Sequence, residues 1–444
     1  MSFLHKSIVV SGGQIVGNVL NMLAGILFAR TLAPSGIGQF ELLRSTSLIV
    51  VTIVALGTGG YANIYFLNNL KVQPVRVVTN DFKVSLVLGV ISAVVLSALP
   101  FCLPSYFGYV NLLAAVWFGV GSGCLLITAS LRPVLAAQLA AKRMVVTDLS
   151  TRVTILALGV FLLTCGRLKL ETALIIVALG NVIACLVSVW YLRPHINMKL
   201  PFDPKFFLYV LKYSLKLSAA NLLLVLSSSI TVVLLRYLVR DFDTVGLYTR
   251  AVAISGMITL VSSAIAPLFY AKWAGLNGKD LARQGEMAMR MNFAFGVVAC
   301  VFVLCFKKLL IRLLYGEAFM GATHALEILA PAVVLVTVFS VCNQMLAGDG
   351  RAMVTVYILL ATLIATLVAC WLIIPLLGIR GAALAVLLGN FVTAITSMIT
   401  CSKLYGLKIH RCIIVGSEDI RFMLKSLSRK SFVQMMPDRI RVQR

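Results

Sequence analysis

Apolar stretches of about 20 residues recur along this chain from Ile8 almost to Tyr405, with only short polar segments between them. At a rise of roughly 1.5 Å per residue, a helix of that length matches the roughly 30 Å hydrocarbon core of a lipid bilayer. Hydrophobic residues make up 60% of the chain, above the level of soluble domains. The sequence therefore predicts an all-α polytopic membrane protein.

The apolar stretches divide into twelve predicted transmembrane helices. They span residues 8–29, 40–66, 84–106, 109–131, 149–165, 172–192, 213–238, 246–271, 291–315, 323–347, 352–375 and 380–405. The fifth is short, and local thinning of the bilayer accommodates such a span. The remaining segment, 406–444, is basic and too polar for a further span.

The two halves of the helical region resemble each other. Short motifs recur at a separation of 208 or 209 residues, namely PSGIGQF with Gly38 and FDTVGLY with Gly246, Arg143 and Arg351, and Gly180-Asn181 and Gly389-Asn390. Such a repeat predicts two six-helix lobes, 1–200 and 201–405, related by a pseudo-two-fold axis along the membrane normal. We expect the proline-containing stretch 193–207 to link the lobes and to absorb their rocking.

Charge indicates the topology. The chain carries 39 Lys and Arg against 15 Asp and Glu, and most of the basic residues lie on the side of the N-terminus or after Tyr405. Since cytoplasmic loops collect Lys and Arg, both termini and the basic tail are predicted to be cytoplasmic. The basic residues lie between apolar spans without a binding module, so no nucleic-acid partner is expected. The ten Cys and four His lack metal-ligand spacing, so we expect no metal site.

Polar residues lie along one face of three predicted helices. They are Ser11, Gln14, Asn18 and Asn21 in the first span, Asn221, Ser228 and Thr231 in the seventh, and Asn390, Thr393 and Ser397 in the last. One such residue is typical of a hydrogen bond between helices. Three stripes together favour a water-filled cavity. Gln14, Asn18, Asn21, Asn221 and Asn390 are therefore candidate cavity residues.

Four basic residues lie inside or close to the ends of predicted spans: Arg44, Lys216, Arg236 and Arg250. They are candidate ligands of an anionic cargo, because Arg binds phosphate bidentately and Lys adds a compact charge. The alternative is that their long side chains extend to the lipid headgroups. Glu41 lies three residues before Arg44, so the two can form an ion pair on one helix face. Glu41 is also the candidate for coupling to H⁺ or Na⁺.

Four segments carry a resemblance to a known family: LFARTLAPSGIGQFELL, YSLKLSAANLLLVLSSSI with GLYTRAVAIS, LLYGEAFMGATHALEILAPAV and LIIPLLGIRGAALAVLLGN. Over residues 8–405 the chain resembles the polysaccharide transporters of the multidrug/oligosaccharidyl-lipid/polysaccharide (MOP) exporter superfamily, which include the Wzx-type O-antigen and exopolysaccharide flippases. One departure is Thr231 after Ile230, where many relatives carry an acid.

The resemblance implies a MATE-like V of two lobes in the bacterial inner membrane. It further implies alternating-access transfer of polyprenyl-diphosphate-linked oligosaccharide, with membrane lipid, polysaccharide polymerase and chain-length machinery as candidate partners. A MATE-like drug/cation antiporter would need embedded acids for a counter-ion. A lipid-linked peptidoglycan precursor flippase usually carries further spans, and a basic tail that recruits glycosyltransferases is an added role to consider. We expect neither enzymatic activity nor a cofactor, because the loops are short and lack a carboxylate pair.

Overall fold

The computed structural model describes residues 3–60, 62–68, 70, 72–137, 141–259, 278–408 and 412, and the regular structure of these residues is entirely helical. The long helices are α1 (Phe3–Ala55), α3 (Pro74–Cys102), α5 (Leu112–Ala137), α6 (Ala141–Thr164), α7 (Leu170–Leu192), α8 (Pro204–Val239), α9 (Phe242–Gly256), α11 (Gly278–Leu314), α12 (Thr323–Gly348) and α13 (Ala352–Tyr405). Shorter segments are α2 (Ala62–Asn68), α4 (Pro104–Phe107), η1 (Arg193–His195), η2 (Met257–Thr259) and η3 (Glu317–Ala322). The predicted tail lies outside the described residues except for 406–408 and Cys412.

Two of these helices, α1 and α13, are helical hairpins with two arms each. Their backbones leave the helical conformation at Ala33 (φ 57°) and Gly378 (φ 55°). Within the described residues, 9 helices are long and apolar enough to cross a membrane. With each hairpin contributing two crossings, a helix matches every predicted span, although the eighth, 246–271, is described only as far as Thr259.

The turns that follow corresponding helices repeat between the two halves. Ala33 and Arg240 both have positive φ, at 57° and 59°, and they are the non-glycine residues of the described chain that do so. Gly108 and Gly316, at φ 74° and 95°, form a second such pair. Positive φ is uncommon outside glycine, so its recurrence after 207 or 208 residues confirms the internal repeat.

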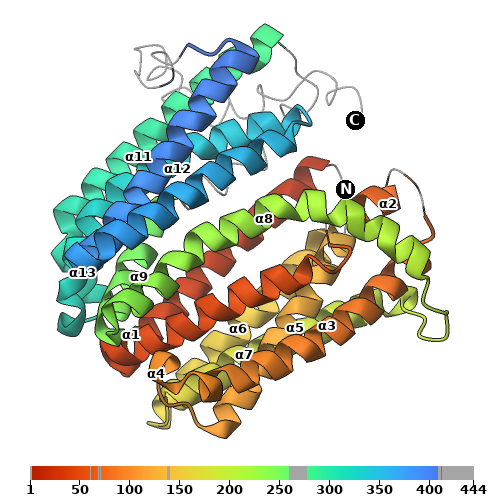
Figure 1. Ribbon diagram of the computed structural model, residues 1–444, viewed down its shortest axis with the longest axis horizontal. Helices are drawn as coiled ribbons and strands as arrows, with labels where there is room; N and C mark the ends of the chain where they lie inside the picture. Colours follow the sequence, from red (N-terminus) through yellow and green to blue (C-terminus); the bar gives the residue numbers. More distant parts are fainter. Residues whose placement is uncertain are drawn as a thin grey trace.

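The helices form two lobes that diverge toward one end of the molecule (Figure 1). The first lobe contains α1, α3, α5, α6 and α7, and the second contains α8, α9, α11, α12 and α13. Helix α1 packs against α8 and α9 of the second lobe. We call the end that holds the first residues of α1 and the last residues of α13 the terminal end, and the end that holds the turns at Ala33 and Arg240 the distal end.

The lobes touch backbone to backbone at Gly38 and Gly246, which are the two glycines of the sequence repeat. A Cβ atom on Gly38 would lie 1.9 Å from the carbonyl oxygen of Phe242, and one on Gly246 would lie 2.0 Å from that of Pro34. Such distances exclude any side chain at either position. The repeat therefore brings its own two copies together near the distal end, on the axis that relates the lobes.

Glycine also sets the packing inside the first lobe, and this gives a stability prediction. A Cβ atom on Gly119 of α5 would lie 2.3 Å from the carbonyl oxygen of Ala93 in α3, whereas one on Gly12 would meet nothing within 4 Å. Overpacking of this kind costs about 1–3 kcal/mol. We expect Gly119→Ala to lower the melting temperature in detergent, with Gly12→Ala as the matched control. Equal melting temperatures for the two variants would contradict the close α3–α5 contact.

The linker between the lobes is held by the first lobe. Lys83 Nζ donates to the carbonyl oxygen of Leu200 at 2.6 Å, and Asn80 Oδ1 accepts from the backbone N–H of Asp203 at 3.0 Å. These contacts fix residues 193–207 to α3. The linker is therefore bound to the first lobe in this conformation, and its part in the rocking of the lobes stays a prediction.

Candidate functional site

A cavity of about 820 Å³ lies between the lobes. Most of its wall comes from α1, α5, α6 and α7 of the first lobe, and α8, α9, η2 and Tyr315 contribute the rest. Its lining extends from Arg132 and Asp148 in the half of the molecule nearer the terminal end to Ile37 and Tyr315 near the distal end. Its polar lining residues are Asn18, Asn21, Glu41, Arg44, Ser45, Ser47, Ser122, Thr128, Arg132, Thr147, Asp148, Thr151, Arg152, Asn181, Ser228, Thr249, Arg250 and Thr259.

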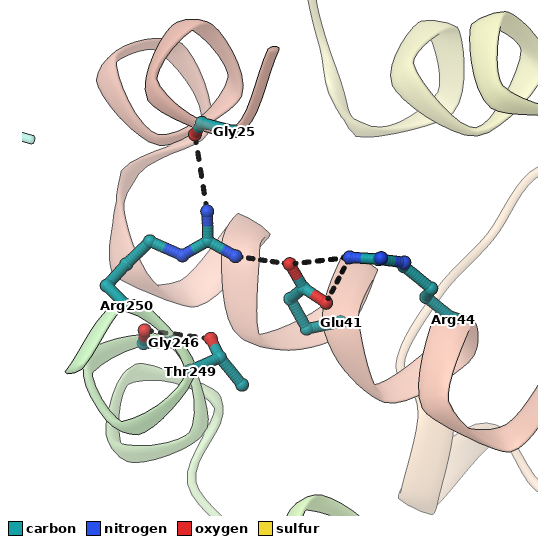
Figure 2. Close-up of polar contacts among 6 residues, drawn as sticks. All are labelled: Gly25, Glu41, Arg44, Gly246, Thr249 and Arg250. Carbon is teal, nitrogen blue, oxygen red and sulfur yellow. Dashed lines mark hydrogen bonds and ion pairs between the residues drawn. The ribbon is translucent and has the colours of Figure 1, made fainter. Parts of the chain in front are cut away.

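Glu41 lies in the lining near the distal end, which we call the base of the cavity. Its carboxylate contacts an arginine of each lobe (Figure 2). Its carboxylate forms an ion pair with Arg44 on the same α1 arm, Nη1 to Oε2 at 3.2 Å, and a second one with Nη2 of Arg250 on α9. Arg250 Nη1 also donates to the carbonyl oxygen of Gly25 at 3.3 Å. Gly25 and Glu41 would lie roughly 24 Å apart on a straight helix. Arg250 can reach both because α1 folds back at Ala33.

The two arginines differ in what remains available to a ligand. The Arg250 side chain is 6% exposed and lies over the Tyr315 ring, with its Cζ 5.6 Å from the ring centroid. Arg44 is 46% exposed. The buried guanidinium is committed to holding Glu41 and α1, whereas Arg44 presents most of its hydrogen-bond donors to the cavity.

A second charged group lies nearer the terminal end, on α5 and α6. Arg152 Nη1 donates to Oδ1 of Asn18 at 3.1 Å, and Arg132 forms an ion pair with Asp148 at 2.6 Å. Arg152 lies directly against Gly17, since a Cβ there would be 2.5 Å from its guanidinium nitrogen. The cavity therefore has cationic groups at two depths.

The charges of the lining do not balance. Four arginines (Arg44, Arg132, Arg152 and Arg250) face two carboxylates (Glu41 and Asp148), which gives a formal charge of +2. Both carboxylates are already ion-paired with arginine. The cavity is therefore suited to an anionic ligand rather than a cationic one.

The structure brings together five of the residues named from the sequence: Asn18, Asn21, Glu41, Arg44 and Arg250 all line the cavity. The ion pair predicted between Glu41 and Arg44 is confirmed.

Of the other candidate residues that the structure describes, Gln14, Asn221, Arg236 and Asn390 lie outside this lining, whereas Ser228 of the seventh-span stripe belongs to it. Arg236 binds backbone carbonyls of the first lobe, and Gln14 and Asn221 lie elsewhere on α1 and α8. Asn390 Nδ2 donates to the carbonyl oxygen of Ala332 at 3.0 Å, so it ties α13 to α12 in the manner of interhelical hydrogen bonds. The side chain of Lys216 lies outside the described residues.

Sequence reasoning missed the charged group on α5 and α6. Asp148 and Arg152 are four residues apart, a spacing that places them on one helix face, and this was the available signal. Asp81 lies just before the predicted third span, yet it is 3% exposed and accepts hydrogen bonds from Ser130 at 2.5 Å and from the Gly59 N–H at 2.6 Å. It holds the segment after α1 in place rather than facing solvent.

Comparison with solved structures identifies the fold. An inward-facing multidrug resistance MATE family transporter of the MOP superfamily matches with a TM-score of 0.71 and 17% sequence identity, covering 90% of this chain and 98% of that one. Lipid II flippase MurJ in an inward closed conformation also gives 0.71, at 12% identity, covering 91% and 89%. A MOP superfamily transporter from Pyrococcus furiosus gives 0.68, at 17% identity, covering 90% and 95%. The chain is a multi-pass membrane protein with the MOP transporter fold.

Comparison with protein families gives the more specific result. A family model described as polysaccharide biosynthesis protein matches residues 3–269, more than half of the chain. The chain belongs to this polysaccharide biosynthesis family, and the resemblance found in the sequence is confirmed. No curated protein matches the chain significantly.

Proposed function

We propose that the protein is a flippase that moves polyprenyl-diphosphate-linked oligosaccharide repeat units across the inner membrane by alternating access. The observation that carries this proposal is the cavity of net charge +2 between two lobes of a polysaccharide biosynthesis family member. The cargo has a hydrophilic head that would be costly to move through hydrocarbon unless polar groups replace its hydration. A lining of arginines, amides and hydroxyls supplies such groups.

The arginines and the asparagines of the cavity are suited to different parts of the cargo. Arg44 near the base and Arg152 nearer the terminal end are the candidate diphosphate ligands, because guanidinium pairs with phosphate oxygens bidentately. Asn18, Asn21 and Asn181 are suited to sugar hydroxyls, since each amide offers both donors and acceptors. The polyprenyl tail stays in the lipid beside the lobes.

The orientation follows from the positive-inside bias. With both termini cytoplasmic, the lobes diverge toward the cytoplasm, where lipid-linked units would enter. In the bacterial inner membrane, this orientation places the distal end on the periplasmic side. The two lobes, taken as 1–200 and 201–405, would rock against each other, and the basic tail, 406–444, would lie at the anionic cytoplasmic leaflet.

A drug/cation antiporter is the second candidate, and the paired carboxylates disfavour it. Coupling to H⁺ or Na⁺ through Glu41 would require this residue to leave both Arg44 and Arg250. A peptidoglycan precursor flippase shares the fold and an anionic cargo, so transport of the two cargoes has to be compared.

The test is transport in liposomes that contain the purified protein. A fluorescent oligosaccharide on a short polyprenyl diphosphate is placed in both leaflets, and a membrane-impermeant quencher reports the fraction that becomes accessible. We expect the protein to raise this fraction above that of protein-free liposomes. Faster movement of lipid II would favour the peptidoglycan reading. Efflux of a cationic dye without movement of the lipid-linked sugar would contradict the proposal.

A further inference from the structure

Arg30, at the end of the first arm of α1, crosses from the first lobe to the second. Its Nε donates to the carbonyl oxygen of Leu314 at 3.0 Å, and its Nη2 donates to that of Leu313. These carbonyls end α11, and the last carbonyls of a helix have no partner within the helix. The guanidinium therefore caps a helix of the opposite lobe, where the helix dipole also favours a cation.

Arg236, at the end of α8, makes the reverse crossing. Its Nε donates to the carbonyl oxygen of Tyr106 at 3.0 Å, and its Nη2 to that of Ser105 at 3.1 Å, both in α4 of the first lobe. Its Cζ lies 3.7 Å from the centroid of the Phe242 ring, and the residue is 6% exposed. Because Arg236 is shielded from water, both its hydrogen bonds and its cation–π contact with Phe242 are strengthened.

The two contacts follow the internal repeat closely, although their donors, Arg30 and Arg236, lie 206 rather than 208 residues apart. The acceptors Ser105 and Tyr106 precede Leu313 and Leu314 by 208 residues each, the spacing found between Gly38 and Gly246. Each lobe thus gives one arginine and receives one, as in the reciprocal interfaces of two-fold assemblies. The Gly38–Gly246 backbone contact belongs to the same closed end.

We propose that Arg30 and Arg236 form a reciprocal clamp that closes the distal end and is released when the cavity opens to that side. Neither residue touches the cavity, so both act as positioning residues for the two conformations. The proposal rests on alternating access in the proposed function, but it concerns the gate and is independent of the cargo. It gives Arg236, which the sequence named as a cargo ligand, a different role.

If the clamp holds the distal end closed, loss of either arginine should speed hydrogen–deuterium exchange in the same two segments between the lobes. Loss of hydrogen bonds to a charged group shifts the closed-to-open ratio by roughly tenfold or more. We expect Arg236→Ala to speed hydrogen–deuterium exchange by about that factor in peptides covering both 34–44 and 242–250, measured by mass spectrometry on the full chain without cargo. Arg30→Ala should act on the same peptides but less, because Arg30 is exposed.

The matched control is Arg312→Ala, which removes an exposed ion pair with Glu317 near the same end but within one lobe. It should leave both peptides unchanged, and Arg236→Lys should fall between the wild type and Arg236→Ala. Faster exchange confined to residues 310–315 or 104–107 would show local helix capping only and would overturn the proposal, as would unchanged exchange. If Arg236→Ala fails to fold, the exchange rates of Arg30→Ala and Arg236→Lys still test the clamp.

The exchange experiment contains no cargo. Its result can therefore be interpreted even if the flippase assay fails.

Discussion

Glu41→Gln is expected to be among the most destabilising single substitutions in the chain. The change removes the only carboxylate shown to contact Arg250 among the described residues, and Arg250 is 6% exposed. Leaving a buried charge without its partner costs about 3–5 kcal/mol. It also leaves two arginines near each other without the anion between them. We expect a clear fall in the melting temperature in detergent, measured by intrinsic fluorescence.

Two further variants separate the ion pair from other effects of the substitution. Arg44→Gln removes the exposed partner, and exposed pairs contribute only about 0–1 kcal/mol, so its melting temperature should change little. The double variant Glu41→Gln/Arg250→Gln removes both buried charges and should recover part of the lost stability. A Glu41→Gln protein as stable as the wild type would contradict the ion pair between the lobes. A stable Glu41→Gln variant that still transports would also exclude Glu41 from ion coupling.

The fold could be predicted from the sequence because it depends on local length and on repetition. Apolar segments long enough to cross a bilayer marked the helices, and the separation of Gly38 from Gly246 marked the repeat. What could not be read was that these two glycines touch. The sequence shows that two positions are equivalent, and only the arrangement of the lobes shows that equivalent positions meet on the axis.

The site was predictable only where partners are close in sequence. The spacing of Glu41 and Arg44 predicted their ion pair, since residues three apart share a helix face. Arg250 pairs with the same carboxylate from 209 residues away, and no local pattern indicates this. The role of Arg236 could not be predicted from the sequence. A basic residue near a span end is equally compatible with a cargo ligand, a headgroup contact and a contact between lobes.

Arg44→Ala is expected to cause the largest loss of transport with the least loss of stability. Arg44 is the most exposed arginine at the base of the cavity, and its partner Glu41 keeps Arg250 when Arg44 is removed. A hydrogen bond to a charged group contributes about 1.5–3 kcal/mol, which corresponds to roughly 10–150-fold in affinity. We expect translocation of the diphosphate-linked oligosaccharide at low cargo concentration to fall by a factor in that range.

Two control variants test whether Arg44 acts as a bidentate ligand of the cargo. Arg44→Lys keeps the charge but loses the bidentate geometry, so it should retain intermediate activity. Arg167→Ala removes an exposed arginine outside the cavity lining and should transport as the wild type does. Wild-type rates for Arg44→Ala would remove this residue from the site. A cationic cargo would give the opposite sign, because the loss of a positive charge from a lining of +2 would then speed transport rather than slow it.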